Sequence, residues 1–108
     1  MEGFDAQRLA EVAELLGDSG MLMDLIQTMR KEFAGVPDEI QNLLVQGDVI
    51  AVKQKLHSLK GVAGNLGAVK IQEAAMVMEH KLEGGADIAA ELKILAQVWY
   101  AFEKIKIG

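Results

Sequence analysis

Residues 48–64 read DVIAVKQKLHSLKGVAG and set the pattern that the rest of the chain follows. Their apolar residues recur at steps of three or four, which is the spacing of one face of an α-helix. This inward stripe consists of Val49, Val52, Leu56, Leu59 and Ala63. Asp48 precedes the stripe as an N-cap residue, because its carboxylate can accept a hydrogen bond from the first turn. The stretch therefore predicts an amphipathic helix that begins after Asp48 and ends near Gly64.

The same spacing of apolar residues runs through nearly the whole sequence, which contains one proline and almost no strand-like alternation. Glycine-containing breaks divide it into five helical segments. The segments are expected at about 5–16, 19–46, 48–64, 68–82 and 87–106. The first is short, and the others are long and joined by short connections. The sequence therefore predicts an all-α fold, an antiparallel four-helix bundle with a short additional N-terminal helix.

Two arrangements of residues 19–46 fit the pattern. The apolar stripe continues through Pro37, which predicts one long helix with a kink. A proline inside a helix removes a backbone donor and clashes with the preceding turn. Two helices that meet near Gly35 are therefore the alternative.

The composition limits the class of protein. With 108 residues, of which 51% are hydrophobic, the chain is expected to form one domain over residues 1–108. It has no cysteine, which excludes disulfides and thiolate metal sites. Its net charge of −5 argues against a nucleic-acid partner, since proteins that bind phosphate backbones carry a surplus of Lys and Arg.

The sequence also bears on the compartment. No stretch approaches the roughly 18 uninterrupted apolar residues of a membrane span. The N-terminus lacks the basic start of a secretory signal. A soluble, cytoplasmic domain without membrane contact of its own is expected. A domain cut from a longer membrane-anchored protein would have the same sequence features. A freestanding protein and a fragment of a longer one therefore both stay open.

His57 is expected on the polar side of its helix. At about 100° per residue, His57 falls roughly 120° and Gly61 roughly 160° from the centre of the apolar stripe. Lys60 falls at roughly 60°, on the flank. The glycine leaves a bare strip of helix beside the imidazole, and the lysine could hold an ammonium near a phosphate on the ring. Taken singly, each residue is also typical of an ordinary helix surface.

Residues 57–67 read HSLKGVAGNLG, in which a histidine is followed by Lys-Gly and later by Leu-Gly. This order resembles the signature of histidine-containing phosphotransfer (HPt) domains, and the resemblance extends over nearly the whole chain. It implies that His57 is phosphorylated, on its distal nitrogen Nε2. It also implies that Lys60 assists the phosphoryl group electrostatically and that Gly61 gives a receiver domain access to the ring. Such chemistry needs no activating triad, because phosphoryl transfer depends mainly on positioning and charge neutralisation.

The resemblance implies partners as well. Response-regulator receiver domains would exchange phosphoryl groups with His57, and a hybrid sensor kinase is a further candidate. No cofactor of the chain's own is expected, and Mg²⁺ is expected on the partner receiver domain. The sequence has no glycine-rich phosphate loop, so kinase activity of its own is not expected. Ile50, two turns before His57, is the best candidate for an exposed apolar docking residue. Transient docking of this kind favours a monomer.

Glu79 is expected to lie level with His57. In an antiparallel hairpin that turns near Ala68, residues whose numbers sum to about 136 lie opposite each other. Family members often use a Gln or another polar residue of this helix to bond the histidine, and Glu79 would be its counterpart. A carboxylate there would accept a hydrogen bond from the imidazole but repel an incoming phosphate. A solvated Glu79 is the alternative. His80 is expected at the surface, and no ligand motif predicts a metal site.

Two other functions stay open beside a relay between receiver aspartates. The phosphoacceptor domain of a chemotaxis-type histidine kinase has the same fold and is loaded by a kinase domain instead of a receiver. A structural or adaptor bundle would keep the fold without the chemistry. The local motif barely separates the first two functions.

Overall fold

A computed structural model of the protein describes residues 19–104, with side chains from residue 23 onward. The described chain folds into helices joined by turns, and it contains no strand between residues 19 and 104. The helices are α2 (Ser19–Glu32), α3 (Val36–Val45), α4 (Val49–Leu66), α5 (Val69–Glu83) and α6 (Ala89–Lys104). The predicted all-α class is confirmed. The predicted N-terminal helix at about 5–16 lies outside the described residues.

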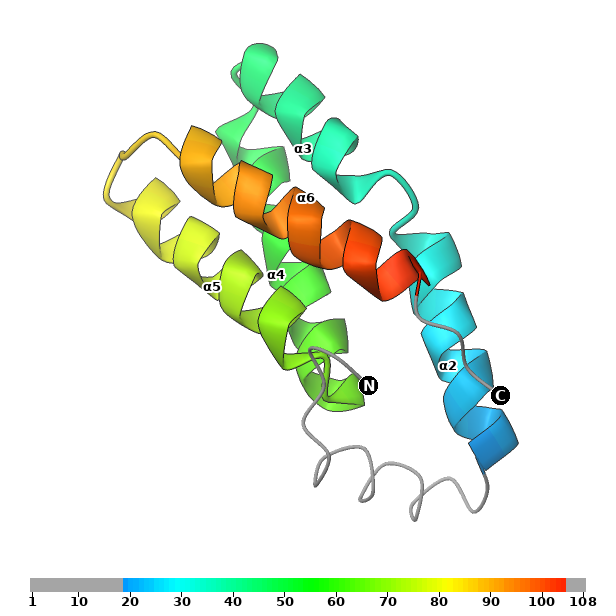
Figure 1. Cartoon of the computed structure of the whole chain (residues 1–108). Coiled ribbons are helices and arrows are strands. Elements are labelled where there is room, and N and C mark those ends of the chain that lie inside the picture. Colours follow the sequence, from blue (N-terminus) through cyan, green and yellow to red (C-terminus); the bar gives the residue numbers. More distant parts are fainter. Residues whose placement is uncertain (1–18, 105–108) are drawn as a thin grey trace.

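The helices form an antiparallel bundle with four arms (Figure 1). Together α2 and α3 make the first arm, and α4, α5 and α6 follow with alternating direction. The connection between α4 and α5 is very short, because α4 ends at Leu66 and α5 begins at Val69. The predicted four-helix bundle is therefore observed, and α4 packs most extensively against α5.

The first arm is broken near Gly35, which is the second of the two predicted arrangements. Gly35 has a φ of 71°, in the left-handed region that glycine adopts most readily. Pro37 follows in the first turn of α3 and has no backbone donor for the carbonyl of Phe33. That carbonyl accepts a hydrogen bond from the Val36 amide at 3.0 Å instead. The proline thus starts a new helix rather than bending an old one.

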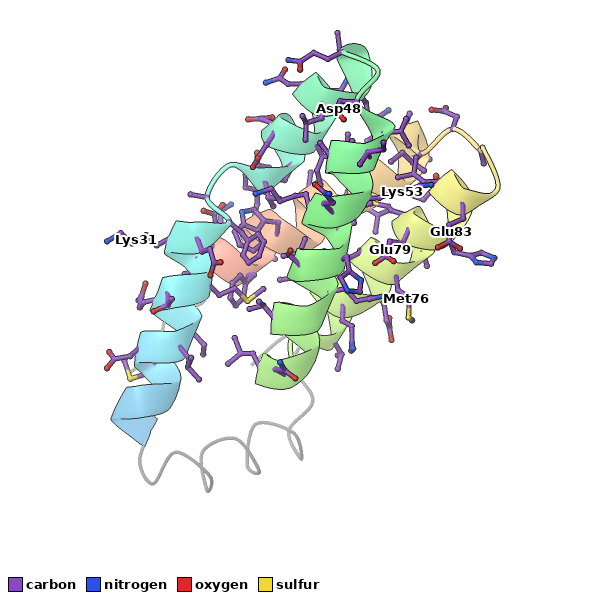
Figure 2. All side chains as sticks on the ribbon, turned by 180° about the vertical axis from the view of Figure 1, so that it is seen from behind. Lys31, Asp48, Lys53, Met76, Glu79 and Glu83 are labelled. Atoms are coloured by element: carbon purple, nitrogen blue, oxygen red, sulfur yellow. The ribbon has the colours of Figure 1, made fainter. Side chains whose placement is uncertain are left out.

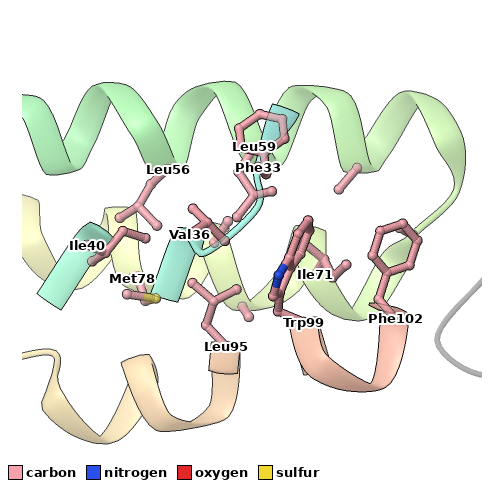
Figure 3. Close-up of a cluster of buried hydrophobic side chains, with 14 of the residues drawn as sticks. Phe33, Val36, Ile40, Leu56, Leu59, Ile71, Met78, Leu95, Trp99 and Phe102 are labelled. Atoms are coloured by element: carbon pink, nitrogen blue, oxygen red, sulfur yellow. The ribbon is translucent and has the colours of Figure 1, made fainter. Parts of the chain in front are cut away.

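The core is a single apolar cluster to which every described helix contributes (Figure 3). Trp99 is its largest fully buried side chain, and its ring packs against Phe102 with centroids 5.4 Å apart. From α4 the core receives the predicted residues Val52, Leu56, Leu59 and Ala63. Val49, also predicted inward, remains 40% exposed because it stands in the first turn of α4 at the end of the bundle.

Polar contacts connect the helices at the rim of the core. The Arg30 guanidinium donates to the carbonyl of Phe102 at 2.7 Å and lies 5.3 Å from the centroid of its ring. Between α5 and α6, Lys81 donates to Glu91 at 3.0 Å. This hydrogen bond lowers the pKa of the Glu91 carboxyl. Each contact joins α6 to another arm of the bundle.

The ends of α4 show how its sequence sets its length. At the start, the Asp48 carboxylate accepts a hydrogen bond from the Ala51 amide at 3.1 Å, as predicted for an N-cap. The helix continues through Gly64 and ends at Leu66, and Gly67, whose φ is 85°, caps it. Ala68 donates to the carbonyl of Ala63 at 2.8 Å, which closes a Schellman-type cap. The predicted end near Gly64 is therefore two residues too early.

Replacing Gly67 by Ala is expected to lower the free energy of unfolding by about 1–2 kcal/mol, because a Cβ disfavours the left-handed conformation. The matched control is Gly84→Ala at the end of α5, where φ is −80° and a Cβ would make ordinary contacts. The control is expected to change stability by less than about 0.5 kcal/mol. Urea unfolding measures both variants. Equal losses would show that the left-handed cap of α4 does not contribute as described.

Candidate functional site

His57 lies on the solvent side of α4. Its neighbours Leu56 and Leu59 are fully buried, and the helical repeat turns the position between them outward. The His57 side chain is 76% exposed. The predicted orientation is confirmed, and the imidazole is open to a partner.

Lys60 and Glu79 meet across the seam between α4 and α5. The Lys60 ammonium lies 3.1 Å from Oε1 of Glu79 and donates to Oε2 at 3.4 Å. Both side chains are largely buried, with 27% of Lys60 and 17% of Glu79 exposed. Figure 2 shows Glu79 on α5 beside α4, with Met76 and Glu83 a turn away on either side. The seam therefore holds a partly desolvated ion pair one helical turn from the histidine.

The same carboxylate faces His57. Nδ1 of His57 lies 3.7 Å from Oε1 of Glu79, so the predicted level positions are confirmed. This distance is too long for a hydrogen bond. Oε1 is buried and makes no hydrogen bond within the described part of the chain; its contact with Lys60 is electrostatic. Since Nδ1 is the nitrogen toward Glu79, Nε2 on the other side of the ring is left for a partner.

The two glycines beside the seam have different surroundings. A Cβ built on Gly61 would meet nothing within 4 Å, so the predicted bare strip is present next to His57. A Cβ built on Gly64 would lie 2.5 Å from Nε2 of Gln72. The Gln72 amide of α5 therefore packs directly over Gly64. Gln72 was not predicted as a site residue, although 64 and 72 add to 136, the same sum as 57 and 79.

Exposed apolar side chains flank the site. Ile50, on α4 two turns before His57, is 72% exposed, as predicted for a docking residue. Met76, on α5, is 50% exposed, whereas Met29 and Met78 are buried in the core. The two exposed side chains come from different helices, α4 and α5. Apolar residues around a polar centre are typical of surfaces that bind another protein transiently.

The described residues show no metal centre. His80 is exposed, as predicted. Between residues 19 and 104, no three side chains of His, Asp or Glu gather closely enough to hold a metal ion. None of the helices in this range is long and apolar enough to cross a bilayer.

Comparison with known proteins identifies the family. A sequence model of the Hpt domain matches residues 20–104. The match covers α3 to α6 completely, and it covers α2 except for its first residue, Ser19. Neither a curated protein nor a solved structure gave a match. Domains of this family carry out histidine phosphotransfer in two-component signalling and interact with the receiver domains of response regulators. The chain belongs to the Hpt domain family.

Proposed function

We propose that this chain relays a phosphoryl group between the aspartates of receiver domains through phosphohistidine at His57. The observation that carries the proposal is the 76% exposed imidazole beside the Lys60 ammonium and the bare strip at Gly61. A receiver active site must reach the ring closely, and the surface around His57 offers that access. The ammonium supplies the positive charge that a phosphoryl group needs.

The transfer step follows from the orientation of the ring. Nε2 attacks the phosphorus of an aspartyl phosphate on the receiver, so the Nε2–P bond forms as the P–O bond to the aspartate breaks. The electron pair of that bond leaves with the aspartate carboxylate. Nδ1 keeps its proton, and the positive charge that develops on the ring lies toward Glu79. Transfer to a second receiver reverses these changes, and Mg²⁺ held by the receiver would add charge neutralisation.

A receiver domain phosphorylated on its aspartate tests the relay. Mixed with this chain, it is expected to lose its label to His57, and the label is expected to be stable in base and labile in acid. A second, unlabelled receiver should then take the label from this chain. Loading only by the ATP-binding domain of a kinase would favour the chemotaxis-type phosphoacceptor. No loading from either source would leave a structural or adaptor bundle.

Replacing Gly61 by Ala is expected to separate stability from transfer. The added Cβ meets nothing within the protein, so the free energy of unfolding should rise by about 0.5–1 kcal/mol. The same methyl group would stand between α4 and the receiver, and overpacking of a close contact costs about 1–3 kcal/mol. Transfer from the receiver is therefore expected to slow by about tenfold.

Ser58→Ala is the matched control for this variant. Ser58 is exposed on the same helix and points toward α3, where it lines a shallow pocket with Glu39. This change also favours the helix but places no new atom on the bare strip. It should leave the transfer rate unchanged. An unchanged rate in Gly61→Ala as well would rule out the access role of Gly61.

A further inference from the structure

We infer that Lys60 changes partner when His57 is phosphorylated, leaving Glu79 for the phosphoryl group while Glu79 passes to the ring nitrogen Nδ1. The inference rests on the proposed function and makes Glu79 a positioning residue that acts through Lys60. It concerns how strongly the site holds its phosphoryl group.

The Lys60 ammonium is already paired in the unloaded site. Lys60 lies within 3.4 Å of both oxygens of the Glu79 carboxylate, and its charge is neutralised there. A phosphoryl group brings additional negative charge of about −1.5 to −2. It would meet a carboxylate a few ångströms from the ring, together with an ammonium that is already paired. The phosphorylated site can use Lys60 only if the ion pair opens.

The geometry allows the ammonium to move between the two anions. Lys60 is three residues after His57, so the two side chains emerge as neighbours on one helix face. Among the described contacts, the Lys60 ammonium is held by one residue, Glu79 of α5. Rotation about the bonds of the flexible lysine side chain would turn the ammonium from Glu79 toward a phosphoryl group on the ring.

The carboxylate would not be left alone after the exchange. Oε1 of Glu79 lies 3.7 Å from Nδ1 of His57 and 3.1 Å from Nζ of Lys60. A ring that carries a phosphoryl group on Nε2 retains a proton on Nδ1 and has more positive charge than the free imidazole. It can therefore donate to Oε1 as the ammonium leaves. This matters because a buried carboxylate oxygen without a partner is strongly unfavourable.

The exchange has a direct consequence for the relay. Opening the Lys60–Glu79 pair opposes loading of His57, and re-forming it favours transfer onward. A neutral side chain at position 79 would leave Lys60 available from the start. The native pair thus weakens retention of the phosphoryl group, which suits an intermediate that must pass it on.

Phosphoramidate tests the exchange without any partner protein. Nε2 attacks its phosphorus, the P–N bond breaks, and the protonated nitrogen leaves as ammonia. Glu79→Gln keeps an oxygen that can accept from Nδ1 but removes the charge that holds Lys60. We expect the initial loading rate of Glu79→Gln to exceed that of the wild type by about threefold to tenfold, because Lys60 no longer has to leave a charge-assisted contact with Glu79. Glu83→Gln, an exposed residue one turn along α5, is the matched control and should load at the wild-type rate.

A double-mutant cycle shows whether Glu79 acts through Lys60. Lys60→Met is expected to load several times more slowly than the wild type, and adding Glu79→Gln to it should bring no gain. Intact mass gives the extent of loading, a His57→Gln variant corrects for any reaction at the exposed His80, and thermal unfolding verifies that each variant folds.

Each outcome decides between the two proposals. A wild type that takes no phosphoryl group on His57 would overturn the proposed function, and the exchange with it. Normal loading of the wild type, with Glu79→Gln no faster than Glu83→Gln, would overturn the exchange alone. A gain from Glu79→Gln that persists in the Lys60→Met background would show direct repulsion by the carboxylate, and would also overturn the exchange.

Discussion

Replacing His57 by Gln is expected to abolish phosphoryl acceptance while leaving the free energy of unfolding within about 0.5 kcal/mol of the wild type. The amide nitrogen of glutamine is not nucleophilic, so no residual transfer through position 57 is expected. The stability should hold because the side chain is 76% exposed and its described contact, with Glu79, is 3.7 Å long. The two effects together are typical of a residue that does chemistry without supporting the fold.

The measurement pairs label transfer from a phosphorylated receiver with urea unfolding. His80→Gln is the matched control, since it makes the same substitution at the other exposed histidine of the chain. This control should accept the phosphoryl group as the wild type does. Acceptance by His57→Gln, or its loss in His80→Gln, would place the phosphoacceptor elsewhere. A large loss of stability in His57→Gln would contradict the orientation of α4 described above.

Replacing Trp99 by Ala is expected to lower the free energy of unfolding by about 3–5 kcal/mol. Trp99 is 0% exposed and packs beside Phe102, so truncation leaves a cavity that the helices cannot close. A domain of this size has about 5–15 kcal/mol of stability in all. The variant should therefore melt far below the wild type, by about 4–8 °C for each kcal/mol lost.

Two further variants make the result at Trp99 quantitative. Trp99→Phe should lose only about 1–2 kcal/mol, because it keeps an aromatic ring and removes an indole donor. That donor, Nε1, is buried without a hydrogen-bond partner among the described residues. Tyr100→Ala, the next residue along α6 and 43% exposed, is the matched control and should lose less than about 1 kcal/mol. Equal losses at positions 99 and 100 would contradict the packing of α6.

The helices could be predicted because their apolar residues recur with the helical period. This periodicity gave α4, α5 and α6 and the inward residues of α4, including Leu56 and Leu59. It could not decide between a kink and a break at Gly35, since a stripe of apolar residues passes through either. It also placed the end of α4 near Gly64 instead of at Leu66. Gly64 and Gly67 both lie near that end, and the hydrogen bonds of the cap form at Gly67. The spacing of apolar residues carries no information about those hydrogen bonds.

The sequence predicted where the site residues lie on their helices, but it did not predict which side chains contact each other. Helical geometry turned His57 outward, and the register of the hairpin brought Glu79 level with it. The same arithmetic did not show that the carboxylate is held by Lys60, because it places backbones and not the ends of long side chains. Gln72 was missed for the same reason. The motif that indicated the family, residues 57–67, lies on α4 and its C-cap, whereas Gln72 and Glu79 come from α5.

The short connection between α4 and α5 bears on the order of events during folding. His57, Lys60, Gly64, Gln72 and Glu79 all lie within one hairpin whose two helices are joined by two residues, Gly67 and Ala68. Closing so short a loop sacrifices little chain entropy, and contacts between residues close in sequence form quickly. The arrangement around the histidine can therefore arise early, before the first arm docks. A chain emerging from the ribosome would need to have extended only to the end of α5 for these residues to meet.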